Sequence, residues 1–314
     1  MQAKQQTAEQ TLKQIISWRP ALSSFLQTLS PLLMQEDLLC DKLAKELLQA
    51  GLTLPMCSPT RMQQGSSLLS DEELPDLGSF LFRTANSILP TLEIFPNITI
   101  DESSKNLFAD MNTATQKLFF QAITGNNATL LTEFAAEKSF DVSHLLFLAH
   151  FPFSILLKAL VHNAVADLEI APWDENNVWQ QGYCPVCGSY PTIGWLDKPV
   201  IDERNTYLIE GGGKKHLHCG VCGANWRFIR IACPHCGINK SKHLEILTEE
   251  ENTHGESLDW CEQCHFYCPI VDLRERLEIP HLDTQAIGML HLAIIAKEKQ
   301  LAPLRVSFWN NFSS

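Results

Sequence analysis

The sequence lacks a long apolar segment. No stretch approaches the roughly 20 uninterrupted apolar residues that a membrane-spanning helix requires, and the most apolar run, 145–160, is interrupted by His150, Pro152 and Lys158. The first residues are polar and rich in glutamine, without the apolar core and cleavage site of a secretory signal. We therefore expect a cytoplasmic protein without membrane insertion, in which this run forms a buried helix.

Clusters of basic residues are also scarce. The 314 residues contain 24 Lys and Arg against 36 Asp and Glu, which gives a formal net charge of −12. Because affinity for nucleic acids depends largely on basic contacts with phosphates, we expect no nucleic-acid partner. The simplest explanation of the charge is an acidic, solvated surface, and the alternative is a helical face that recruits a basic client segment.

Signatures of catalysis are missing as well. The sequence contains no nucleophile elbow, no dinucleotide-binding fingerprint and no Ser/His/Asp order, so no catalytic residue is predicted. The glycines 211–213, followed by Lys214 and Lys215, lack the order of a phosphate-binding loop and a following helix. We interpret them as the turn of a hairpin over residues 207–218.

Cysteine is abundant and regularly spaced. Eight of the eleven cysteines form four Cys-x-x-Cys pairs: Cys184/Cys187, Cys219/Cys222, Cys233/Cys236 and Cys261/Cys264. Two such pairs supply the four thiolates of one tetrahedral metal site, so four pairs predict two metal ions. Thiols stay reduced in the cytosol, which favours metal ligands over disulfides. A thioredoxin-like dithiol is the alternative, but it needs only one pair.

The residues around the pairs favour metal binding. The sequences C-P-V-C-G (184–188) and C-P-H-C-G (233–237) place glycine after the second thiol, and H-C-G-V-C-G (218–223) keeps this glycine. Glycine permits the positive φ that turns amide groups toward a thiolate. The sequence W-C-E-Q-C-H (260–265) has no glycine and carries the weakest of the four signals.

The spacing between pairs restricts which of them share an ion. The segment 226–231 between Cys222 and Cys233 is rich in aromatic and β-branched residues and predicts a strand. The ten intervening residues would extend over about 30 Å, so the second and third pairs should bind different ions. We expect Cys184, Cys187, Cys219 and Cys222 to form one site and Cys233, Cys236, Cys261 and Cys264 the other. An interleaved pairing is the alternative.

Histidines and spare cysteines near the pairs are weaker candidates. One of His216, His218, His235 and His265 could replace a cysteine as a ligand, but eight thiols make this unnecessary. We expect these histidines to donate hydrogen bonds around the sites or to be exposed. We interpret Cys268 as structural, and Cys40 and Cys57 as small apolar fillers.

The fold class predicted is α+β. We expect an all-α helical domain over 1–175, two rubredoxin-like or zinc-ribbon modules over 176–228 and 229–279, and a C-terminal helix and tail over 280–314. Apolar residues recur at helical spacing over 38–48, 107–123, 145–168 and 285–301. Asp101 with Ser103 and Ser104 predicts a cap for the second of these helices, and 51–76 predicts a loop.

The cysteine motifs resemble those of a known family. The segments W-x-x-G-Y-C-P-V-C-G-S-Y-P (179–191), L-H-C-G-V-C-G-A-N-W (217–226), C-P-H-C-G (233–237) and C-E-Q-C-H-F-Y (261–267) are similar to the formate dehydrogenase accessory protein FdhE family. The specific match covers 179–272. Two features depart from the family pattern: Tyr267 is followed by Cys268 and Pro269, and an arginine-rich N-terminal run is missing.

The resemblance implies a cytoplasmic maturation factor that is not an enzyme and that binds the catalytic subunit of a molybdenum- or tungsten-dependent formate dehydrogenase. It also implies two iron ions, bound in rubredoxin fashion by the eight paired cysteines. Zinc is an alternative, since both metals accept four thiolates. Two other functions remain as alternatives: a rubredoxin-type electron carrier, and a nucleic-acid-binding ribbon protein that uses Trp226, Arg227, Phe228 and Arg230.

Overall fold

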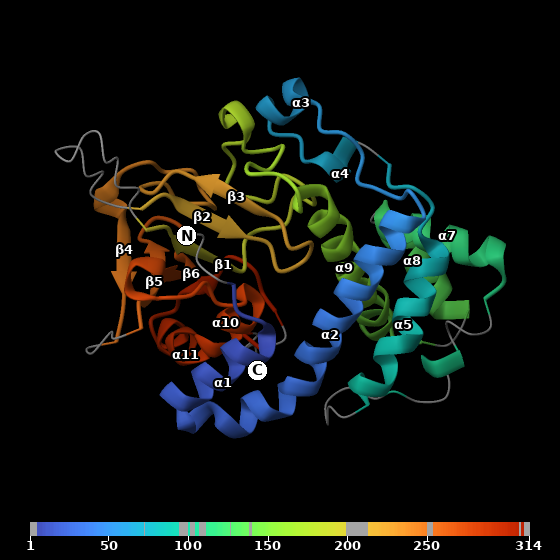
Figure 1. Ribbon diagram of the computed structural model, residues 1–314, viewed down its shortest axis with the longest axis horizontal. Helices are drawn as coiled ribbons and strands as arrows, with labels where there is room; N and C mark the ends of the chain where they lie inside the picture. The colour runs from blue at the N-terminus through green and yellow to red at the C-terminus, as the bar shows by residue number, and fades with distance from the viewer. Residues whose placement is uncertain are drawn as a thin grey trace. The chain divides into compact units, whose positions relative to one another are not determined.

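A computed structural model describes residues 5–71, 73–93, 100, 104–106, 111–125, 127–137, 140–198, 213–249, 254–307 and 309–310 (Figure 1). The chain divides into two compact units. The cysteine-rich unit comprises Met1–Leu26, Cys57–Ser70 and Glu169–Ser314. The helical unit comprises Gln27–Met56 and Asp71–Leu168. The linear domain boundaries given above stay a prediction.

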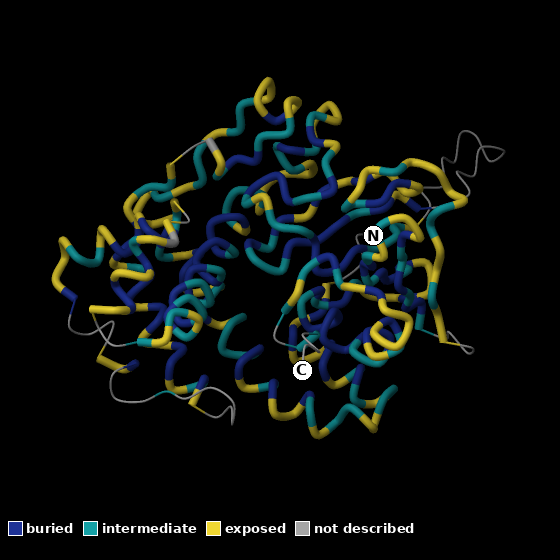
Figure 2. The backbone as a smooth tube through the Cα atoms, turned by 180° about the vertical axis from the view of Figure 1, so that it is seen from behind, coloured by how far each residue is buried: buried dark blue, intermediate teal, exposed yellow. Residues whose placement is uncertain are grey.

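The helical unit is built from long amphipathic helices. Its elements are α2 (Ser23–Gln49, which begins in the other unit), α5 (Gly78–Leu92), α7 (Thr113–Thr124), α8 (Ala128–Glu137) and α9 (Val142–Val165). Buried and exposed positions alternate along the helices, as Figure 2 shows. The ring of Phe119 packs edge-on against Phe82 and Phe134, at centroid distances of 5.9 and 5.3 Å. These contacts join α5, α7 and α8 in one apolar core.

The predicted helix over 107–123 begins later than expected. The side chain of Asn112 accepts a hydrogen bond from the backbone N–H of Thr115 at 3.0 Å and caps α7. Of the predicted cap, Asp101 and Ser103 lie outside the described residues, as do positions 107–110, and Ser104 is itself helical. Asp141 caps α9 in the same way through the N–H of His144.

Helix α9 contains the apolar run noted in the sequence. Among the described residues it is the one helix long and apolar enough to cross a membrane, with a mean hydropathy of 1.7. However, 61% of its most apolar window is buried inside the protein. This burial is consistent with the core helix of a soluble protein, as predicted for this run.

The cysteine-rich unit is organised around one seven-stranded sheet in the order β3-β2-β1-β6-β5-β4, with β7 paired to β6. Its strands are β1 (Ile193–Leu196), β2 (Lys215–His218), β3 (Asn225–Phe228), β4 (Leu244–Leu247), β5 (Glu256–Cys261), β6 (Phe266–Asp272) and β7 (Ala302–Pro303). Strands β1 to β3 and β4 to β6 form two antiparallel meanders. The meanders join through parallel pairing of β1 with β6, with Gly194 opposite Ile270.

Helices contribute the rest of this unit. They are α1 (Ala8–Trp18), α3 (Pro59–Gln63), α4 (Leu68–Asp71), α10 (Leu282–Gly288) and α11 (Leu290–Glu298), with short 3-10 turns at Pro20–Leu22, Glu175–Asn177, Ser241–His243 and Leu273–Glu275. Helices α10 and α11 share an apolar core with the sheet. This core includes Leu292 of α11, Ile193 of β1 and Leu258 of β5. Burying each such side chain contributes about 1.5–3 kcal/mol.

The predicted C-terminal helix over 285–301 is two helices. Helix α10 ends at Gly288 and α11 begins at Leu290. At the junction, a Cβ atom on Gly288 would lie 2.5 Å from Cδ1 of Ile15, so any larger residue would require the Ile15 side chain to shift.

A buried ionic network also holds α1 to the sheet. Glu256 Oε1 accepts from Arg276 and from the side-chain amide of Gln285, each at 2.7 Å, and Glu256 Oε2 forms an ion pair with Arg19 at 2.7 Å. The ring of Trp18 stacks on His254 at a centroid distance of 3.9 Å. Because the carboxylate has two guanidinium partners, its charge is compensated within the core.

Candidate metal centres

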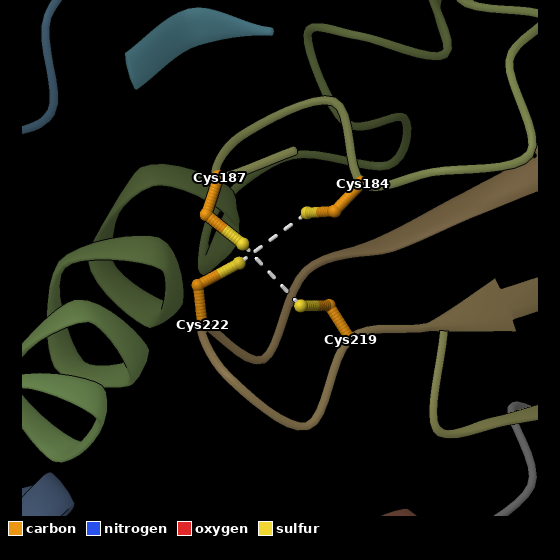
Figure 3. A group of neighbouring side chains, drawn as sticks. All are labelled: Cys184, Cys187, Cys219 and Cys222. Atoms are coloured by element: carbon orange, nitrogen blue, oxygen red, sulfur yellow. Dashed lines mark hydrogen bonds between the residues drawn. The ribbon is translucent and has the colours of Figure 1, made fainter. Parts of the chain in front are cut away.

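The first cluster joins the first two cysteine pairs. The sulfur atoms of Cys184, Cys187, Cys219 and Cys222 all lie within 4.8 Å of one another. Figure 3 shows the four side chains pointing toward one common centre. The Sγ atoms of Cys184 and Cys222 are 3.4 Å apart, and those of Cys187 and Cys219 are 3.5 Å apart.

The second cluster joins the third and fourth pairs. The sulfur atoms of Cys233, Cys236, Cys261 and Cys264 also lie within 4.8 Å of one another. The distance from Cys233 to Cys264 is 3.6 Å, and that from Cys236 to Cys261 is 3.8 Å. The structure therefore groups the pairs in sequence order and does not interleave them.

Both clusters have dimensions that fit a thiolate-bound ion. Four sulfurs in a tetrahedron about 2.3 Å from a central metal are separated by about 3.8 Å, close to the separations observed. All eleven cysteines are free thiols, and the observed distances far exceed the roughly 2.05 Å of a disulfide bond. Four soft sulfur donors suit zinc or iron, so each group of four could hold one such ion.

Each meander positions its cluster in the same way. One pair precedes the first strand of the meander, and the other lies at the turn between its second and third strands. The pair Cys219/Cys222 connects β2 to β3, while Cys261/Cys264 connects β5 to β6. The prediction of two consecutive ribbon modules within an α+β fold is confirmed, although the sequence did not predict that their strands share one sheet.

Every pair lies in a tight turn with positive φ at the residue after its second cysteine. That residue is Gly188 (φ 75°), Gly223 (φ 74°) or Gly237 (φ 71°) in three turns. In the fourth turn, His265 adopts φ 60° in place of glycine and donates its N–H to the Cys261 carbonyl at 2.8 Å. The fourth turn therefore has histidine where the others have glycine, but its backbone conformation is the same.

Backbone amides point at the sulfur atoms. The N–H of Val186 donates to Cys184 Sγ at 3.4 Å. In the second cluster, Cys233 accepts from the N–H groups of His235 and Cys236, and Cys264 accepts from that of Phe266. These donors favour charged sulfur and offset part of the negative charge that four thiolates concentrate.

Thiol ionisation in the first cluster is uneven. Burial raises the pKa of Cys184 and of Cys222 well above the usual range. Hydrogen bonds from Cys184, Cys219 and Cys222 hold the pKa of Cys187 well below it. In the absence of a cation the cluster therefore retains protons, and binding of a metal ion must release them.

The neighbouring histidines have other partners. His218 contacts Asn225 Oδ1 at 2.7 Å and Asp283 Oδ1 at 3.1 Å. His216 pairs with a carboxylate oxygen of Asp197 at 2.8 Å. His235 stacks on Phe266 at a centroid distance of 4.0 Å, and His265 stacks on the ring of Trp260. Neither four-cysteine group includes any of these rings.

The three remaining cysteines belong to neither group. Burial raises the pKa of Cys268, on β6, to about 12 and that of Cys40, on α2, to about 12. Burial also raises the pKa of Cys57. The thiols of Cys40 and Cys268 therefore stay protonated at neutral pH, which makes them poor metal ligands.

Trp226 and Phe228 do not form the exposed stacking surface that the nucleic-acid alternative requires. Trp226 is fully buried and donates its indole N–H to the Gln181 carbonyl at 3.1 Å. Phe228 is also buried. The predicted strand ends at Phe228, and 229–231 form an exposed turn. Because neither ring can reach a base, this strand offers no aromatic platform.

One ion pair beside the second cluster was not predicted. Lys215 Nζ lies 2.7 Å from Asp259 Oδ2, and the lysine side chain is only 1% exposed. Both residues line a cavity that also includes Cys233, Cys261 and Cys268. The sequence gives little signal for this pair, because lysine is ordinarily exposed and the partners lie on β2 and β5. Of the hairpin predicted over 207–218, residues 207–212 lie outside the described residues, and the second arm contains β2.

Together, the helical unit, the mixed sheet and the two four-cysteine groups define a class of protein with twin ribbon-like metal centres. No family profile matches the chain. The Protein FdhE homolog of Aquifex aeolicus is 29% identical over 135 residues, which are 43% of this chain and 44% of that protein. Protein FdhE of Escherichia coli O1:K1 / APEC is 26% identical over 121 residues, 38% of this chain and 34% of that protein. These matches span less than half of each relative.

A solved structure extends the likeness to the fold of the whole chain. The FdhE protein from Pseudomonas aeruginosa matches 98% of this chain and 96% of its own, with a TM-score of 0.57 and 17% identity. At this identity the likeness shows the fold alone. The homologues named FdhE confirm the resemblance to the FdhE family that the cysteine motifs predicted, and the shared fold agrees with it.

Proposed function

We propose that this chain is a cytoplasmic, non-enzymatic maturation factor that binds the catalytic subunit of a formate dehydrogenase during assembly. The names of its relatives imply an accessory role around formate dehydrogenase. The observation that carries the proposal is the presence of two complete four-cysteine groups in a fold shared with an FdhE protein.

The proposal assigns the eight paired cysteines as the ligands of two ions. The first ion takes Cys184, Cys187, Cys219 and Cys222, and the second takes Cys233, Cys236, Cys261 and Cys264. We propose iron as the native metal, with zinc as the alternative, because both accept four thiolates. Each Cys-x-x-Cys turn forms a knuckle, numbered first to fourth in chain order. When bound, either ion would join two knuckles and rigidify its meander.

Binding of the catalytic subunit is tested by affinity capture. The tagged full-length chain is expressed anaerobically in cells that produce a formate dehydrogenase, and co-purifying proteins are identified by mass spectrometry. We expect the catalytic subunit with the tagged chain and not with the tag alone. Recovery of no catalytic subunit, by a chain that carries two ions, would reject the proposed partner and leave the metal sites intact.

Electron transfer of the rubredoxin type is a second candidate, favoured by the exposure of Cys236 in the second cluster. An iron ion in four thiolates cycles between two oxidation states, whereas zinc does not. A reversible visible spectrum together with turnover by a reductase would favour this function. A colourless native protein that contains only zinc would exclude it.

A further inference from the structure

The two clusters have the same donor set but differ in how far the protein encloses them. In the first cluster, Cys184, Cys219 and Cys222 are each 0% exposed, and Cys187 is half-buried. None of the four cysteines of this cluster is exposed. A small molecule therefore reaches the centre of the first cluster only if the surrounding chain opens.

The second cluster is open on one side. Cys233 and Cys261 are buried, but Cys264 is half-buried and Cys236 is exposed. Cys236 occupies the position that corresponds to Cys187, since both are the second thiol of a C-P-x-C-G sequence. The difference in exposure therefore arises from what packs on the two knuckles and not from their local sequence.

The neighbours of the two knuckles show the same difference. The segment before α4 packs on the first knuckle: the N–H groups of Leu68 and Leu69 donate to the carbonyls of Pro185 and Val186 at 2.8 and 2.9 Å. A Cβ atom on Gly188 would lie 3.2 Å from Ser67 Oγ, whereas one on the matching Gly237 would have nothing within 4 Å. At the third knuckle, Gly182 lies against Pro234, but among the described residues no backbone N–H donates to the carbonyls of Pro234 and His235.

We infer that the two centres have different roles: the second is the exchangeable, solvent-reactive metal site and the first is a structural site. The inference rests on the proposed function in one respect, that both clusters hold an ion. Replacement of a metal ligand requires an incoming donor to approach the ion. At the second cluster this approach is open beside Cys236, and at the first it requires the 67–69 segment to separate from Pro185 and Val186.

The chemistry of release is a ligand exchange without oxidation. A chelator displaces the sulfurs from the divalent ion, and the freed thiolates take protons from water. An alkylating reagent such as iodoacetamide acts at the same exposed sulfur: a sulfur–carbon bond forms, the carbon–iodine bond breaks and iodide leaves. Both reactions should begin at Cys236.

The test measures zinc release from the full-length, zinc-loaded chain. Zinc transfer to 4-(2-pyridylazo)resorcinol is followed by absorbance, and native mass spectrometry counts the ions that remain on each chain. We expect two kinetic phases, with the first ion leaving at least about tenfold faster than the second, a difference in opening free energy of about 1.4 kcal/mol. The chain should remain folded by circular dichroism after the first phase.

Matched variants assign the phases to the clusters. Cys236→Ser should retain one ion and show only the slow phase, and Cys187→Ser should retain one ion and show only the fast phase. If Cys187→Ser does not fold, peptide mapping of wild type after brief iodoacetamide treatment gives the same assignment. Cys236 and Cys264 should then be alkylated before Cys184, Cys219 and Cys222.

Three results would overturn the inference. Release of both ions at one rate, loss of the fast phase in Cys187→Ser, or first alkylation in the first cluster would each show that enclosure does not decide reactivity. A chain that binds no zinc at all would reject the metal sites of the proposed function as well. The stoichiometry thus separates failure of the inference from failure of the function on which it rests.

Discussion

The backbone of Gly182 lies directly against the backbone of Pro234. A Cβ atom on Gly182 would be 1.9 Å from the Pro234 carbonyl oxygen and 2.4 Å from its Cα. Gly182 lies two residues before Cys184 of the first cluster, and Pro234 follows Cys233 of the second. The close approach therefore packs the first knuckle on the third, and a side chain at Gly182 would separate them.

Replacing Gly182 tests this contact. We expect Gly182→Ala to lower the free energy of unfolding by about 2–4 kcal/mol, because the clash is with backbone that cannot rotate away. Gly237→Ala is the control: its φ of 71° is unfavourable for alanine, but a Cβ there has open space. We expect a cost of about 1 kcal/mol for the control. Equal midpoints of urea unfolding for the two variants would contradict the contact.

Cysteines inside and outside the clusters should respond differently to substitution. We expect Cys219→Ser to lose one of two metal ions and several kcal/mol of stability, since the binding free energy of such sites is largely folding free energy. Cys268→Ala removes an equally buried thiol that belongs to neither cluster. It should retain both ions. Elemental analysis and melting temperature distinguish the two, and unchanged metal content in Cys219→Ser would refute its assignment as a ligand.

The ion pair between Lys215 and Asp259 links the two meanders. Asp259→Asn leaves the ammonium of a lysine that is 1% exposed without its partner. We expect a loss of about 3–5 kcal/mol in the free energy of unfolding, measured by urea denaturation. The double variant Lys215→Met/Asp259→Leu should lose less than the single variant, because no charge remains buried. A double variant less stable than Asp259→Asn would show that the pair itself stabilises the sheet.

His291 should make stability depend on pH. Burial, followed by the nearby charge of Arg19, lowers the pKa of His291 below its usual value of about 6.5, although Glu249 and Glu256 oppose this. The unfolded chain therefore takes up the proton first, and stability falls as pH drops below the unfolded pKa.

We expect His291→Gln to lose less stability than wild type when the pH falls from about 8 to about 5. Thermal unfolding of both proteins at each pH measures the difference. The clusters titrate equally in both proteins, so they cancel in the comparison. A wild type that loses no more stability than the variant would contradict the lowered pKa.

The cysteine pairs could be located from the sequence because their chemistry is local. Two residues between thiols, a glycine after the second thiol and an intervening segment too long for both its ends to reach one ion were enough to group the pairs as the structure has them, although the strand within that segment ends at Phe228. The fourth turn keeps the same conformation without glycine, since His265 adopts a φ of 60°.

Long-range pairing could not be predicted in the same way. The parallel match of β1 with β6 places Gly194 beside Ile270, and neither strand carries a signal for the other. The single helix expected over 285–301 divides at Gly288, a residue that packs on Ile15, far away in the sequence. Such features depend on tertiary contacts that helical periodicity does not encode.

The most direct measurement is native mass spectrometry of the full-length chain purified without oxygen, combined with elemental analysis. Two four-cysteine groups predict two divalent ions per chain, with the sulfurs of Cys184, Cys219 and Cys222 resistant to alkylation until the protein is unfolded with a chelator. A chain that carries no metal, and whose mass is lower by the hydrogens lost to disulfide bonds between these cysteines, would contradict the assignment of both centres.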